Sequence, residues 1–179
     1  MISLNFIFWM YVVLFAVIGG MRGWARELLV SFSVILCLFI ISVLERFVPF
    51  IRDILPNNSP ISMFWLRSIL LLSLVFFGYQ TPKFPKLASS GRFIRDKFQD
   101  ILLGLFLGGI NGYFIFGSLW FYMHQANYPF EMIKAPDANT ELGRAALELL
   151  SLMPPQVLGS PAIYFAVAVA FVFVLVVFL

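Results

Sequence analysis

Cysteine, histidine and charged residues are all scarce in this chain of 179 residues. It has one cysteine and one histidine, and Asp, Glu, Lys and Arg together make up 12% of it, whereas a soluble domain has about 25%. With Cys37 alone, no disulfide within the chain is possible, which excludes a disulfide-stabilised scaffold. The same composition excludes a disordered chain, a nucleic-acid-binding protein and an ordinary soluble enzyme.

Hydrophobic residues are in large excess instead. They make up 61% of the sequence, which includes 22 phenylalanines, whereas about 45–50% is usual. A globule of 20.4 kDa leaves roughly a third of its unfolded surface exposed to its surroundings. Such a globule cannot hide this much apolar surface from water, so we expect a membrane protein.

Five stretches are long and apolar enough to cross a hydrocarbon core of about 30 Å, which takes about 20 helical residues. They cover residues 4–21, 28–44, 61–79, 101–123 and 162–179. Because none alternates like a barrel strand, we predict an all-α integral membrane protein. It is expected to be a bundle of about five transmembrane helices plus a short amphipathic interfacial helix. The first stretch lacks the flanks of a cleaved signal peptide, which favours a membrane anchor.

Lys and Arg are distributed unevenly between the two sides of this bundle. The turn with Arg22 and Arg26 and the loop Lys83–Lys97 together carry seven basic and three acidic residues, against five and six on the other side. The positive-inside rule then places the turn and this loop in the cytoplasm. We expect a multi-pass protein of a bacterial inner (plasma) membrane, with its N-terminus outside and its C-terminus inside.

Two stretches between the spans are more polar. Residues 49–60 contain three prolines, which indicates an outer loop or a re-entrant one. In the outer connector 125–160, the periodicity of residues 140–153 predicts an amphipathic helix, either on the membrane interface or packed on the bundle. We therefore expect a four-helix core over 1–124, this connector, and an additional transmembrane helix over 161–179.

A short motif lies between the first two spans. It consists of Arg22, Gly23, Trp24, Arg26 and Glu27. On a helix the two arginines would share a face, and Glu27 could offset one of their charges. A topogenic turn, with arginines at cytoplasmic headgroups and an interfacial tryptophan, explains it, and so does a docking point for anionic lipid or a partner.

A glycine series lies in the fourth span. Gly104, Gly108 and Gly112 are four residues apart and form one stripe, which lets a neighbouring helix approach closely. That neighbour can belong to the same chain or to another copy. Asn111 lies in the same span, and a buried amide there needs a hydrogen-bond partner.

Arg67 and His124 are the remaining polar candidates near the spans. Arg67 can reach the outer interface, with Glu45 or Asp53 as an acidic partner. His124 is an interfacial residue or, as a weak candidate, an axial ligand to a haem-like or chlorophyll-like pigment; one histidine cannot make a zinc site. No catalytic motif is present, so we expect no enzymatic activity, no metal and no cofactor.

The two motifs together resemble the colicin V production protein family (CvpA), which consists of small bacterial inner-membrane proteins. The first motif is Arg22 to Glu27 at the start of the second span, and the second runs from Asp100 through the three glycines at the start of the fourth. The resemblance covers residues 1–124 well and residues 125–160 loosely. The chain departs from it at Asn5 and Asn111, where family members often have an acidic and a basic residue.

The resemblance implies a role in toxin production and secretion or in envelope physiology, and assigns no chemical activity to a residue. We expect a non-enzymatic protein that acts through helix–helix and protein–protein contacts. Two alternatives remain: a small-solute transporter or channel, and an accessory subunit of a larger membrane complex, with or without pigment. The expected partners are the lipid bilayer, with anionic headgroups at Arg22, Arg26 and the Lys83–Lys97 loop, and a second copy or another membrane protein. No nucleic acid is expected.

Overall fold

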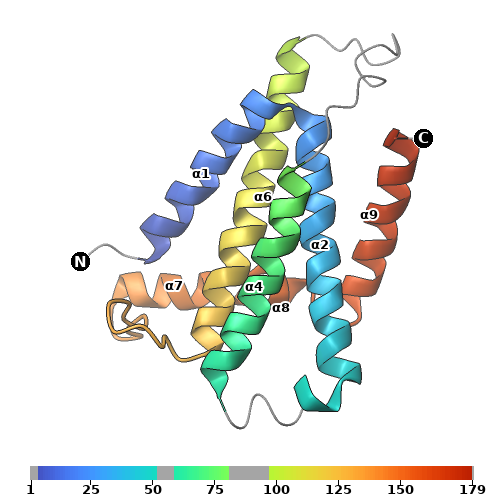
Figure 1. The fold of residues 1–179 in the computed structure, drawn as a ribbon. Helices are drawn as coiled ribbons and strands as arrows, with labels where there is room; N and C mark the ends of the chain where they lie inside the picture. Colours follow the sequence, from blue (N-terminus) through green and yellow to red (C-terminus); the bar gives the residue numbers. More distant parts are fainter. Residues whose placement is uncertain (1–3, 52–58, 81–96, 179) are drawn as a thin grey trace.

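The computed structural model describes residues 4–51, 59–80 and 97–178. These ranges contain helices and no strand, which confirms the all-α prediction. The α-helices are α1 (Leu4–Arg22), α2 (Trp24–Phe47), α4 (Pro60–Tyr79), α6 (Lys97–Gln125), α7 (Glu141–Ser151), α8 (Pro154–Val157) and α9 (Ala162–Phe178). Figure 1 shows α7 and α8 crossing the lower half of the bundle that the long helices form, above the lower ends of α2 and α4. The Lys83–Lys97 loop up to residue 96, and residues 52–58 of the stretch 49–60, lie outside the described residues.

The two ends of the bundle carry different elements. At one end α1 and α4 finish and α2 and α6 begin, and we name it the Arg22 end; it is at the top of Figure 1. At the other, the Arg67 end, α2 and α6 finish and α4 and α9 begin. The end of α9 therefore lies on the same side as the α1–α2 turn.

Four helices, α1, α2, α4 and α6, are long and apolar enough to cross a membrane. The fifth expected span forms as α9 but has 17 residues, or about 26 Å at 1.5 Å per residue. It is shorter than the other four and packs against α2. The structure thus confirms a helical membrane protein with four full-length spans, where the sequence predicted about five.

Local sequence explains where several helices begin. α4 starts at Pro60 after Ser59, whose side chain accepts a hydrogen bond from the Ser62 amide, and proline is favoured in the first turn. α7 starts after Thr140, whose hydroxyl accepts from the Gly143 amide at 3.0 Å. These side chains satisfy amide donors that a helix start leaves unpaired.

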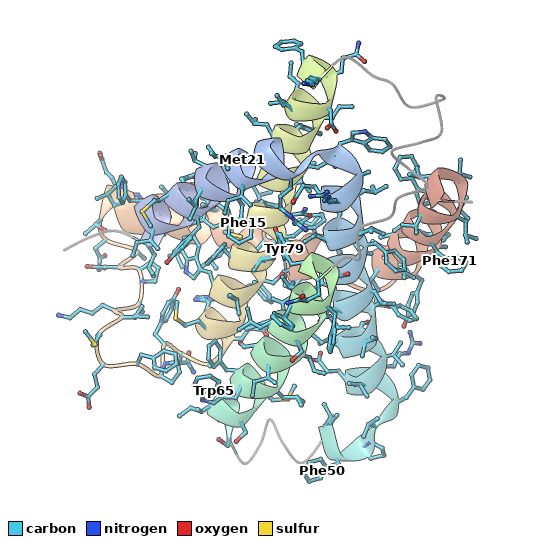
Figure 2. All side chains as sticks on the ribbon, turned by 45° about the horizontal axis from the view of Figure 1, so that its top comes forward. Phe15, Met21, Phe50, Trp65, Tyr79 and Phe171 are labelled. Atoms are coloured by element: carbon cyan, nitrogen blue, oxygen red, sulfur yellow. The ribbon has the colours of Figure 1, made fainter. Side chains whose placement is uncertain are left out.

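α6 is the central helix, since it packs against α1, α2 and α4. Val30, Val34, Leu71 and Ile115 lie in the shared core and are almost fully buried. The outer faces are apolar as well: Met21 is 84% exposed and Phe171 53%, and both point away from the bundle in Figure 2. An apolar core inside an apolar surface is typical of a protein whose solvent is lipid.

α7 forms within the predicted range and is amphipathic. Ala146 and Leu150 are buried, while Arg144 and Glu148 are exposed. Gly143 is buried too, because the helix start packs on the Asp137 backbone, and a Cβ at this glycine would lie 2.6 Å from the Asp137 carbonyl carbon. Packing against α1 and α6 therefore fixes its orientation on the bundle.

Candidate functional site

The two motifs of the sequence meet at the Arg22 end. Gly23 separates α1 from α2 with φ of 86°, a left-handed conformation that favours glycine. The Asp100 carboxylate of α6 accepts a hydrogen bond from the Trp24 amide at 3.1 Å. A Cβ at Gly23 would lie 2.9 Å from that carboxylate, so the turn and the start of α6 fit together only with glycine there.

Arg22 and Glu27 form an ion pair inside the bundle. Arg22 Nη1 lies 2.7 Å from Glu27 Oε1; the carboxylate has no exposed surface, and the Arg22 side chain is 19% exposed. The guanidinium also stacks on the Tyr79 ring, 4.2 Å from its centroid. Nη2 of the same group donates to the Tyr79 carbonyl oxygen at 3.3 Å.

This pairing differs from the expectation that both arginines share one face at the headgroups. Gly23 ends α1 between them, so Arg22 is the last residue of α1 and Arg26 lies in the first turn of α2. Arg22 turns inward to the buried carboxylate, while Arg26 is exposed. Of the two, Arg26 is the arginine whose position suits a headgroup contact.

Asn111 links this ion pair to α6. Its Nδ2 donates to Glu27 Oε2 at 2.8 Å and to the Glu27 carbonyl oxygen at 2.9 Å. Its Oδ1 accepts from the Ser31 hydroxyl at 2.6 Å. Arg22, Glu27, Ser31 and Asn111, which we name the Glu27 cluster, thus join α1, α2 and α6 through one set of hydrogen bonds. The amide in the fourth span has the partner that the sequence required.

The glycine stripe of α6 packs against α1 of the same chain, which answers the question that the sequence left open. A Cβ at Gly108 would lie 2.8 Å from the Gly19 Cα, and a Cβ at Gly112 would lie 2.8 Å from the Phe15 Cβ. Gly104 faces Gly19 as closely. Sequence reasoning missed Gly19 as the partner, although its spacing of four from Gly23 was a usable signal.

Arg67 is the centre of a second group of polar contacts, at the Arg67 end of the bundle. Its Nε donates to Glu45 Oε1 at 2.6 Å, and its Nη1 donates to the Gln125 side-chain oxygen. The guanidinium carbon lies 5.4 Å from the centre of the Tyr122 ring. Glu45 is therefore the acidic partner, and Asp53 lies outside the described residues.

His124 lies in the last turn of α6 and is half-buried. Its ring packs edge-on against Tyr128 at 5.7 Å. Within the described ranges, its buried Nδ1 has no hydrogen-bond partner, and no group of three or more His, Cys, Asp or Glu residues could hold a metal ion.

Comparisons with known proteins were made at the level of families, curated sequences and solved structures. No protein-family model, no curated protein and no solved structure matches it. The likeness to the colicin V production protein family therefore rests on the two motifs. The structure brings the residues of those motifs into one contact region, at the junction of α1, α2 and α6.

The chemistry of the Glu27 cluster is that of a closed, neutral group. One carboxylate is matched by one guanidinium, and an amide and a hydroxyl satisfy the remaining acceptors. A buried charge is tolerated only when it is paired and hydrogen-bonded in this way. These side chains hold three helices in a fixed arrangement.

Proposed function

We propose that this chain is a non-enzymatic protein of the bacterial inner membrane, of the colicin V production type, that acts through contacts with other membrane proteins. One observation carries the proposal: the Trp24–Asp100 hydrogen bond and the Glu27 cluster hold α1, α2 and α6 together. Apart from the exposed Arg26, the charged groups of both motifs are thereby used within the chain. A fixed arrangement of α1, α2 and α6 suits a protein whose surface binds partner proteins.

The proposed contact surface is at the Arg22 end. Arg26 and Lys97 are exposed there, and the first turns of α6 project beyond the α1–α2 turn (Figure 1). Phe98 on this projection is 71% exposed. Basic and aromatic groups side by side suit a partner at the cytoplasmic face, together with anionic headgroups around Arg26.

The test uses a colicin V-secreting strain that lacks its own protein of this family. The wild-type chain is expected to restore toxin release and to co-purify with a membrane-protein partner from mild detergent. Charge reversal at the contact surface, Arg26→Glu with Lys97→Glu, is expected to lower release at least fivefold and to lose that partner.

Lys134→Glu is the matched control, because Lys134 is an exposed lysine of the connector outside the proposed surface. It is expected to leave release and the partner unchanged. The proposal is overturned if the wild-type chain fails to restore release, or if the reversal and the control have equal effects. A partner that proves to be a second copy of this chain would still support it.

A transporter is the second candidate, and Glu27 is the observation that favours it. An ionisable residue inside a membrane helix often belongs to an ion or proton pathway, and Glu27 is fully buried in α2. A proteoliposome assay with an internal pH dye distinguishes the contact proposal from the transporter candidate. The contact proposal expects proton flux equal to that of protein-free liposomes, whereas flux that Glu27→Gln abolishes would establish transport.

A further inference from the structure

A cleft opens at the Arg67 end, separate from the Glu27 cluster. It has a volume of about 390 Å³ and lies between α2, α4 and α6 on one side and the segment 155–160 on the other. Small-molecule sites occupy roughly 300–1,000 Å³, so the cleft is large enough for part of a ligand. Its polar side chains include Ser42, Glu45, Arg46 and Arg67.

The charges in this cleft do not balance. Its lining contains the two guanidinium groups of Arg46 and Arg67 and one carboxylate, Glu45, a net charge of +1. Glu45 pairs with Arg67. Arg46 donates from Nη1 to the Tyr164 hydroxyl at 3.3 Å, and among the described residues it has no carboxylate partner. The cleft therefore favours a ligand with a negative charge.

Part of the lining of the cleft is apolar, and its α2 residues lie deeper in the bundle than Glu45 and Arg46. Leu38, Ile41, Phe121 and Leu158 form this part. Leu38 and Glu45 are seven residues apart on α2, which corresponds to about 10 Å along the helix. Over this distance the lining changes from two arginines at the end of the bundle to hydrocarbon side chains nearer its middle.

We propose that this cleft binds a membrane phospholipid, with the phosphate between Arg46 and Arg67 and the start of one acyl chain along Leu38 and Ile41. Guanidinium groups recognise phosphate through paired hydrogen bonds, and the Arg67 bonds to Glu45 and Gln125 leave Nη2 outside both. The arginines at the end of the cleft match the charged headgroup of a phospholipid, and the apolar residues nearer the middle match its acyl chain. This proposal is independent of the proposed function.

The binding test uses the full chain in mild detergent and native mass spectrometry with three additions. Phosphatidylglycerol is expected to stay bound at low micromolar concentration. Diacylglycerol with the same chains, which has no phosphate, is expected to bind at least tenfold more weakly. Inorganic phosphate at millimolar concentration is expected not to displace the lipid. Equal binding of diacylglycerol, or displacement by inorganic phosphate, would overturn the proposal.

Arg46→Gln is expected to weaken phosphatidylglycerol binding at least fivefold. Arg144→Gln, which removes an exposed arginine of α7 outside the lining of the cleft, is its matched control and is expected to change binding less than twofold. If Arg46→Gln does not fold, Gln156→Glu replaces it, since Gln156 is an exposed residue of the same lining and the change cancels the net charge. Equal losses in the tested variant and the control would show general electrostatic attraction and refute the site.

Discussion

Glu27 is a carboxylate without exposed surface in a helix that is long and apolar enough to cross a membrane. Burial of an ion costs several kcal/mol even after relaxation, and the attraction of a partner offsets this only when the geometry is good. Here Arg22 supplies the charge at 2.7 Å, and Asn111 donates at 2.8 Å. Each of these side chains is therefore stabilising only while the others are present.

This dependence predicts non-additive effects for Arg22→Gln and Glu27→Gln. Each single change leaves a buried or half-buried polar group without its partner and is expected to cost about 1–3 kcal/mol of unfolding free energy. The double variant is expected to lose less than the sum by about 0.5–3 kcal/mol. Unfolding in mixed micelles, followed by circular dichroism, measures the cycle; Arg26→Gln serves as the exposed control. Additive losses would contradict the ion pair.

Asn111→Leu is expected to lower the unfolding free energy by about 1–3 kcal/mol, because Glu27 Oε2 and the Ser31 hydroxyl lose their buried partner. Gln99→Leu also replaces an amide side chain by leucine, at an exposed position of α6, and is expected to stay within about 0.5 kcal/mol. The same unfolding measurement compares them. A neutral result for Asn111→Leu would show that the amide is not part of the network.

At the scale of elements, the contact between α1 and α6 depends on glycine. Gly108→Ala places a Cβ 2.8 Å from the Gly19 Cα, so the two helices must move apart. We expect a loss of about 1–3 kcal/mol from overpacking, and a similar or larger loss for Gly108→Leu. Gly109→Ala is the matched control, because its Cβ would meet the Ala16 Cβ at an ordinary 3.6 Å. Equal stability of the two alanine variants would refute the close contact.

Much of this element structure could be predicted from sequence. Long apolar stretches gave the four full spans, and the periodicity of residues 140–153 gave α7 within one or two residues of its bounds. These features depend on local composition and repeat length. The need of Asn111 for a buried partner could also be predicted, since an amide in lipid has no water to bind.

The partners themselves could not be predicted, because they depend on contacts distant in sequence. Arg22 turns inward since Gly23 takes a left-handed conformation, and the Asp100 carboxylate that fits this turn is 77 positions after it. Likewise, nothing local distinguishes Gly19 of the same chain from a glycine on another copy. Only the folded structure shows which glycine faces the stripe of α6.

For the whole molecule, the bundle fixes which surface residues share a side of the membrane. Arg26 is in the first turn of α2 at the Arg22 end, while Asn139 lies in the connector next to Thr140, which lines a pocket with Leu4 and Asn5 at the opposite end of α1. With the positive-inside orientation, Asn139→Cys is expected to react with an impermeant maleimide in intact cells, and Arg26→Cys only after permeabilisation. Cys37 is fully buried, so background labelling is expected to be low. The reverse pattern would invert the orientation without altering the fold.

The pairing of the first span with the fourth has a consequence for biosynthesis. A ribosome reaches Gly104 about 85 codons after Gly19, which takes roughly 4–17 s at 5–20 residues per second. During this interval the small-residue face of the newly inserted first span is uncovered, and an insertase or another nascent segment can occupy it. The order of translation therefore leaves the Gly19 face of the first span without its partner helix for roughly 4–17 s.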